Sequence, residues 1–98
     1  MTPVEEERLR RRLSAAAQSA VEEILPTVMR NPTTPQKTVA RIVALAAFTK
    51  GVTDDDAIDR LFDVRSCMKS DACKVRNALR PIMGEFLTLA RARMAEVA

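Results

Sequence analysis

Residues 34–51 read TPQKTVARIVALAAFTKG and carry the strongest structural signal in the chain. The stretch opens with a threonine-proline pair, which is typical of a helix start, and Gly51 is a typical helix stop. Between these signals, residues 42–48 place apolar side chains on every side of a helix. A helix without a polar face is usually surrounded by other elements. We therefore predict a central, buried helix from Pro35 to Lys50.

The N-terminal segment has the pattern of an amphipathic helix. Thr2 and Pro3 provide a cap and a first-turn proline, and the glutamates at 5–7 follow at the positive end of the helix dipole. At about 100° per residue, one stripe collects the apolar side chains Leu9, Leu13, Ala16, Ala17, Ala20 and Ile24. The alanines in this stripe allow a neighbouring helix to approach closely. Pro26 either ends the helix or kinks it into a further turn.

A short third helix is expected soon after Gly51. Thr53 stands before three aspartates and is the expected cap, and acids at a helix start are favoured by the helix dipole. The shared apolar face of this helix carries Ile58, Leu61 and Phe62. Its opposite face is acidic.

A last helix is expected in the C-terminal third of the chain. Ser70 and Asp71 form a plausible cap for a helix that runs towards Met94. Its apolar stripe consists of Val75, Leu79, Ile82, Met83, Phe86 and Ala90. Pro81 should kink this helix or mark a break near Asn77.

The predicted fold class is all-α, with residues 1–98 forming a single helical domain, one compact bundle of four to five helices. A chain of 98 residues has the usual length of one domain, and it shows no strand-like alternation, fixed-period repeat or low-complexity linker. The expected core is short and contains few aromatic residues, since these make up only 3% of the chain. Such a core is often completed by a second copy, so a homodimer stays open as an alternative.

The composition excludes most familiar catalytic and metal sites. The chain has no histidine, two cysteines and two glycines. It therefore cannot form a histidine-based or four-cysteine zinc site, a Ser-His-Asp triad, a Cys-His pair or a glycine-rich phosphate loop. Chemistry that uses only Arg, Lys, Glu or Gln stays possible, as in all-helical chorismate mutases, but their residue pattern has no convincing counterpart here. We predict that the chain is not an enzyme and binds no cofactor.

Residues 55–59, DDAID, contain the pattern DDxxD. This pattern resembles the magnesium-diphosphate motif of isoprenyl diphosphate synthases and terpene cyclases. The resemblance covers five residues only, and the second acidic cluster of those larger helical enzymes has no equivalent in this chain. Because the helix dipole alone favours acids at a helix start, we assign no metal to them.

Residues 39–62 partly match a helix-turn-helix. Ala47 and Gly51 have the small residue and turn glycine of that motif at the right spacing. The apolar pair Ile58 and Leu61 comes one position late, and the three aspartates before them would face DNA phosphates. An ordinary helical hairpin is the preferred interpretation.

Charge is segregated along the chain, although its formal sum is only +3. Residues 54–64 hold five aspartates and one arginine, whereas residues 65–98 hold seven bases and three acids. If the last helix is continuous, Arg76, Arg80 and Arg91 lie within about 60° of each other around its axis. Asn77 and Gly84 lie alongside these arginines, and Lys74 lies further round. This ridge is either a solvated face, paired in part with the preceding aspartates, or a binding face for an acidic partner.

Without catalytic residues, a small helical bundle most often acts by presenting a surface. We predict a regulatory protein, an inhibitor or adaptor, that binds an acidic surface of another protein. The predicted partner-binding residues are Arg76, Arg80, Arg91, Lys74 and Asn77. Twelve arginines against four lysines suggest a GC-rich bacterial or phage genome, and an inhibitor encoded by a mobile element fits the size of the chain.

The alternative is a nucleic-acid-binding helical module or a helical subunit of a nucleoprotein complex. The residues expected to contact phosphates are then Arg41, Lys69, Lys74, Arg76, Arg80 and Arg91. Single-strand binders usually add exposed aromatic side chains, but Tyr and Trp are absent and Phe48, Phe62 and Phe86 are all expected to be buried. A protein partner is therefore preferred.

The expected location is the cytoplasm, away from membranes. The longest apolar run has seven residues, far fewer than a membrane span needs, and the start of the chain lacks the apolar region of a secretory signal. Cys67 and Cys73 would point about 120° apart on one straight helix, which prevents a disulfide. Two small, half-buried thiols are expected, with a reactive Cys73 near basic residues as the alternative.

Overall fold

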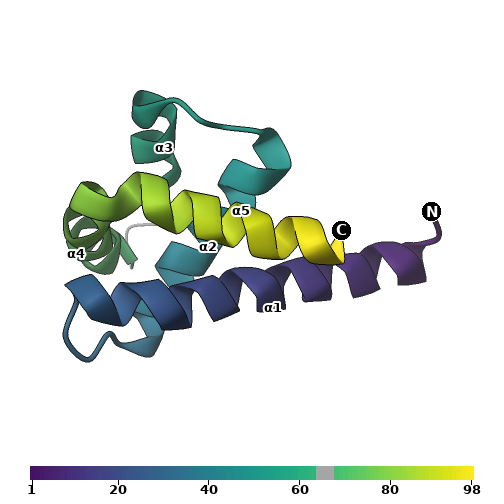
Figure 1. Cartoon of the computed structure of the whole chain (residues 1–98), viewed down its shortest axis with the longest axis horizontal. Coiled ribbons are helices and arrows are strands. Elements are labelled where there is room, and N and C mark those ends of the chain that lie inside the picture. The colour runs from purple at the N-terminus through teal and green to yellow at the C-terminus, as the bar shows by residue number, and fades with distance from the viewer. Residues whose placement is uncertain (64–67) are drawn as a thin grey trace.

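Helices make up nearly all of the structure, a computed structural model that describes residues 1–63 and 68–98 (Figure 1). The predicted all-α fold is confirmed, and no strand forms among these residues. The elements in chain order are α1 (Pro3–Val28), α2 (Thr34–Lys50), α3 (Asp55–Leu61), α4 (Lys69–Leu79), the 3-10 turn η2 (Arg80–Ile82) and α5 (Met83–Val97).

The longest helix, α1, packs mainly against α5 and α2. α5 lies along it in the opposite direction, and α2 packs against it from another side (Figure 1). Arg93 of α5 donates hydrogen bonds to Ser19 Oγ at 2.9 Å and to the Glu23 carboxylate. Lys37 Nζ of α2 lies 3.1 Å from Glu22 Oε2 of α1. α4 packs mainly on α2, which also contacts α3 and α5.

The core is one cluster to which each α-helix contributes buried side chains. Its largest fully buried members are Phe86, Leu25, Leu79 and Met94. Buried alanines of α1 and α2 belong to this cluster, namely Ala17, Ala20, Ala40, Ala44 and Ala47. Phe62 and Phe86 are buried as expected, but Phe48 is only half-buried. The Cα radius of gyration is 13.0 Å, close to the value of about 13 Å that a folded chain of this length should have.

The expectation that α2 is buried on every side is wrong. One face is buried, formed by Val39, Ala40, Val43, Ala44 and Ala47. On the opposite side, Ile42 is 40% exposed and Leu45 is half-buried. The physical reason is the small number of helices, because no element within residues 1–63 and 68–98 covers this side of α2.

Three helices begin one or two residues away from the expected cap. Thr33, not Thr34, caps α2, because its Oγ1 accepts from Gln36 N at 3.3 Å while Gln36 Oε1 accepts from Thr33 N at 2.8 Å. This reciprocal capping box fixes the start of the helix. In α3 the cap is Asp54, whose Oδ2 accepts from Ala57 N at 3.0 Å. α4 begins at Lys69, before the expected Ser70-Asp71 cap, and it has no side-chain cap bond.

The two proline signals have different outcomes. Pro26 lies inside the last turn of α1, and the helix continues to Val28. Pro81 lies in η2, so the predicted interruption of the last helix is confirmed, although it begins at Arg80 rather than near Asn77. The single continuous helix that the predicted arginine ridge requires is therefore not formed. Instead, α4 and α5 point in different directions (Figure 1).

Gly51 ends α2 as predicted. Its φ is +63°, in the left-handed region where glycine has no steric penalty. Val52 N donates to Ala47 O at 3.0 Å and Gly51 N donates to Phe48 O at 3.3 Å, which closes the helix end. Within residues 1–63 and 68–98, no helix combines the length and the hydropathy that crossing a bilayer requires.

Candidate functional site

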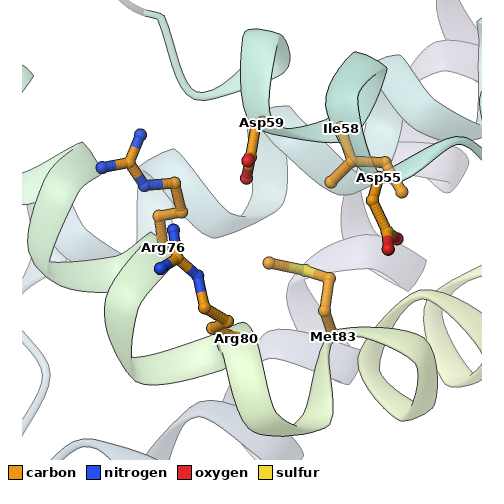
Figure 2. A pocket seen from close by; sticks show the side chains of 6 residues that line it. All are labelled: Asp55, Ile58, Asp59, Arg76, Arg80 and Met83. Carbon is orange, nitrogen blue, oxygen red and sulfur yellow. The ribbon is translucent and has the colours of Figure 1, made fainter.

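A cleft lies between α3 and the corner where α4 turns into α5. Its volume is about 220 Å³, and its lining residues are Asp55, Ile58, Asp59, Arg76, Arg80 and Met83. Figure 2 shows the two arginines on one wall, the two aspartates on α3 opposite, and the Met83 side chain reaching between the walls. Two of the predicted partner-binding residues, Arg76 and Arg80, thus lie across the cleft from the acidic helix α3.

The acidic wall follows from the way α3 is anchored. Ile58 is only 4% exposed and Phe62 is in the core, and at about 100° per residue Asp55 and Asp59 lie beside this apolar face, at its edge. Asp55 and Asp59 are one turn apart and both line the cleft. No ion pair shorter than 4.0 Å joins them to an arginine in the part of the chain that the structure describes.

The basic wall is held by α4. Val75 and Leu79 are fully buried, which places Arg76 and Arg80 one turn apart at the side of the cleft. Arg76 Nη2 lies 3.7 Å from Cys73 Sγ, a weak contact. Its Nε is shielded from solvent and has no hydrogen-bond partner among the described residues. Arg80 is exposed.

The interruption at Pro81 moves Arg91 away from the other two arginines. It lines a neighbouring depression of about 160 Å³ together with Thr53, Gly84, Leu87 and Thr88. The two hollows share Asp55, Ile58 and Met83, so Asp55 stands between Arg91 and the Arg76–Arg80 pair. A Cβ at position 84 would meet nothing within 4 Å. The space beside Gly84 is therefore open.

The remaining predicted contact residues lie outside both hollows. Lys69, Lys74 and Asn77 are exposed on α4, and Asn77 Nδ2 lies 3.8 Å from Cys73 Sγ. Arg41 is half-buried between α1 and α2, where its Nη1 donates to Ser14 Oγ at 2.7 Å. The structure therefore brings together Arg76 and Arg80, keeps Arg91 nearby and separates Arg41 from them.

The thiols and the aspartate motif add no further site. Cys73 is a free, exposed thiol, whereas Cys67 lies outside the described residues. Asp55 and Asp59 of the DDxxD pattern line the cleft, but no group of three potential metal ligands converges within residues 1–63 and 68–98.

A second concave surface was not predicted from the sequence. It is an apolar groove of about 520 Å³ between the N-terminal half of α1 and the uncovered side of α2. Its lining residues are Met1, Glu6, Leu9, Arg10, Leu13, Ile42, Leu45, Ala46 and Thr49. The signal for it was present in the sequence, since α2 is apolar all round and the stripe of α1 begins as early as Leu9.

Comparison of the chain with protein-family models, with curated proteins and with solved structures found no match. The function of the cleft and of the groove therefore has to be inferred from their own shape and chemistry.

Proposed function

We propose that this chain is a non-enzymatic interaction protein that holds an acidic side chain of another protein in the cleft between α3 and the α4–η2 corner. The observation that carries the proposal is the Arg76 guanidinium, which lines the cleft and forms no ion pair within 4.0 Å among the described residues. The forked donors of a guanidinium match the two oxygens of a carboxylate. Arg80, one turn away, adds further donors to the same wall.

The lining of the cleft indicates what kind of segment fits. Two arginines provide forked donors that match a carboxylate, while Ile58 and Met83 provide apolar contact between the walls. The volume of about 220 Å³ suits one or two side chains. A partner segment with an acidic residue next to an aliphatic one meets both requirements, and a polar or basic neighbour would face Asp55 and Asp59.

The same charges disfavour the nucleic-acid alternative. Asp55 and Asp59 face the two arginines across the cleft, so a continuous phosphate backbone would be repelled by both carboxylates, whereas a single acidic side chain can contact the arginine wall alone. Arg41, part of the proposed phosphate-binding set, is engaged with Ser14 instead. Phe62 and Phe86 are buried and Phe48 is half-buried, so stacking platforms for bases are lacking in the described structure.

We further propose that the protein acts as a cytoplasmic inhibitor or adaptor of bacterial or phage type. Such a protein works by occupying a surface of its partner, and this needs a shaped and charged cleft rather than catalytic groups. The excess of arginine over lysine supports this origin.

The proposal is tested by capture from a bacterial lysate, with and without nuclease, followed by titration with the purified partner that mass spectrometry identifies. We expect one protein to be captured in a stoichiometric amount and to remain bound after nuclease treatment. Arg80→Glu, an exposed position, should weaken its binding at least about tenfold. Arg76→Lys keeps the charge but removes the forked donor, and it should also weaken binding by about tenfold.

The matched control is Lys69→Glu/Lys74→Glu, which reverses charge on the same helix outside the cleft. This variant should bind the partner as the wild type does. If Arg80→Glu and the lysine variant reduce binding equally and moderate salt abolishes it, the ligand is a polyanion and the alternative function stands. A partner that binds all three variants as it binds the wild type would remove the cleft as the site.

A further inference from the structure

We propose that a second copy of this chain covers the groove between the N-terminal half of α1 and α2, so that the two copies form a symmetric dimer through antiparallel α1 helices. This surface lies away from the α3–α4 cleft and does not depend on the function proposed for that cleft. Three observations lead to it: an N-terminal half of α1 without buried residues, an apolar side of α2 that is partly exposed, and a charge pattern in α1 that is complementary to itself in antiparallel orientation.

The first half of α1 has no buried residue. The buried side chains of this helix are Ala17, Ala20, Val21 and Leu25, all in its C-terminal half. Figure 1 shows why, because α5 ends partway along α1 and the N-terminal turns extend beyond it. The apolar stripe of this half, which includes Leu9 and Leu13, is therefore only half-buried in a single copy of the chain.

The groove offers apolar surface on both of its walls. Leu9 and Leu13 of α1 stand opposite Ile42 and Leu45 of α2, and Ile42 is 40% exposed. Met1, at the open end, is 77% exposed. Side chains spaced by three or four residues on each wall form the kind of trough into which a single helix packs. A helix with its own apolar stripe is therefore the expected occupant.

The charges at the groove identify that helix as α1 of a second copy. The first turn of α1 carries Glu5, Glu6 and Glu7, and the following turns carry Arg8, Arg10, Arg11 and Arg12. A helix with an acidic end next to a basic block matches a second copy only in antiparallel orientation. Glu6 and Arg10 both line the groove, one turn apart on the same side of the stripe. In an antiparallel pair, Glu6 of each copy faces Arg10 of the other.

The proposed arrangement is a closed symmetric dimer in which each contact between the copies occurs twice. A symmetric dimer uses the same patch on both copies, so each α1 fills the groove of the other and no open face is left. Arg10 also contacts Glu7 of its own helix, which leaves Glu6 as the acid available for the second copy. The proposed interface therefore places two Glu6–Arg10 pairs on either side of a two-fold axis near residue 8, and Leu9, Leu13 and Ile42 provide the apolar contacts along the same groove.

Sedimentation equilibrium on the wild type and two charge-reversed variants provides the test. The wild type should be a dimer at micromolar concentrations. Glu6→Arg and Arg10→Glu each place like charges against each other at both contacts, and each should weaken dimerisation at least about tenfold. An equimolar mixture of the two variants should restore the dimer, because every contact in the mixed pair again joins a base to an acid.

Matched controls separate the interface from effects on the helix itself. Glu5→Arg makes the same change in the first turn but lies outside the groove, and Arg11→Glu loses a contact to Glu7 as Arg10→Glu does. Both controls should dimerise normally. Ile42→Ser, on α2, should also weaken dimerisation, while circular dichroism confirms that its helix content is unchanged.

Three results would overturn the proposal. The wild type could sediment as a monomer over the whole soluble range. The mixed variants could remain monomeric, which would mean that Glu6 and Arg10 do not face each other. Finally, Glu5→Arg and Arg11→Glu could disrupt the dimer as strongly as the groove variants, which would place the interface elsewhere on the molecule.

Discussion

Arg93 has a role in the structure that its charge alone does not predict. By charge alone it belongs to the basic C-terminal third of the chain. In the structure its guanidinium joins α5 to α1 through Ser19 Oγ and the Glu23 carboxylate, and its side chain is 27% exposed. Arg91, two positions earlier, lines a hollow on another side of the same helix. The two arginines are therefore a natural pair for comparison.

We predict that Arg93→Ala lowers the free energy of unfolding by about 1 kcal/mol, because both hydrogen bonds and the partly exposed ion pair are lost. Arg91→Ala should change it by less than about 0.5 kcal/mol. Urea denaturation followed by circular dichroism measures both values. Equal effects of the two substitutions would show that the α1–α5 contact does not depend on Arg93.

At the scale of elements, the start of α2 depends on which of two adjacent threonines caps it. Thr33 and Gln36 exchange two hydrogen bonds, whereas the Thr34 side chain makes none among the described residues. We predict that Thr33→Ala destabilises the protein by about 1 kcal/mol and that Thr34→Ala has less than half of that effect. Thermal unfolding of both variants at one pH provides the comparison. A larger loss with Thr34→Ala would mean that the helix begins one residue later.

Local signals in the sequence were sufficient for the start of α1, the end of α2 and the break at Pro81. Thr2, Gly51 and Pro81 act through steric and hydrogen-bonding rules that involve only neighbouring residues, and all three act as predicted. The capping box of α2 was also readable, since Gln36 stands three residues after Thr33. The directions of α4 and α5, on either side of Pro81, are set by packing against α1 and α2. The order of residues in the sequence does not reveal this packing.

At the scale of the molecule, the sequence likewise lacked the packing information that places the residues of the candidate site. The sequence identified Arg76 and Arg80 and raised the option that the aspartates of the third helix pair with the basic ridge. It could not place Arg91, because that required a continuous helix, and it could not separate Arg41, whose partner Ser14 lies 27 positions away. The groove was missed because the prediction that α2 is buried on all sides requires more covering helices than the described part of the chain contains.

Two surface carboxylates give the whole molecule a defined response to acid. The hydrogen bond from Lys37 holds the pKa of Glu22 below its usual range, and the hydrogen bond from Arg10 does the same for the pKa of Glu7. A lowered pKa in the folded chain means that the ionised form is favoured by folding. The resulting stability is present above the unfolded pKa of glutamate and is lost as the pH falls through the folded pKa.

We therefore expect the free energy of unfolding to decrease as the pH is lowered through the range in which glutamates titrate. Between about pH 6 and about pH 7.5 it should stay nearly constant, because the chain contains no histidine to titrate there. Glu22→Gln removes the carboxylate that links α1 to α2, so its acid slope should be shallower than that of the wild type. Lys37→Met removes the partner and should flatten the slope by a similar amount. Urea denaturation at a series of pH values tests this, and a wild-type slope in both variants would show that the Glu22–Lys37 pair does not contribute to folding.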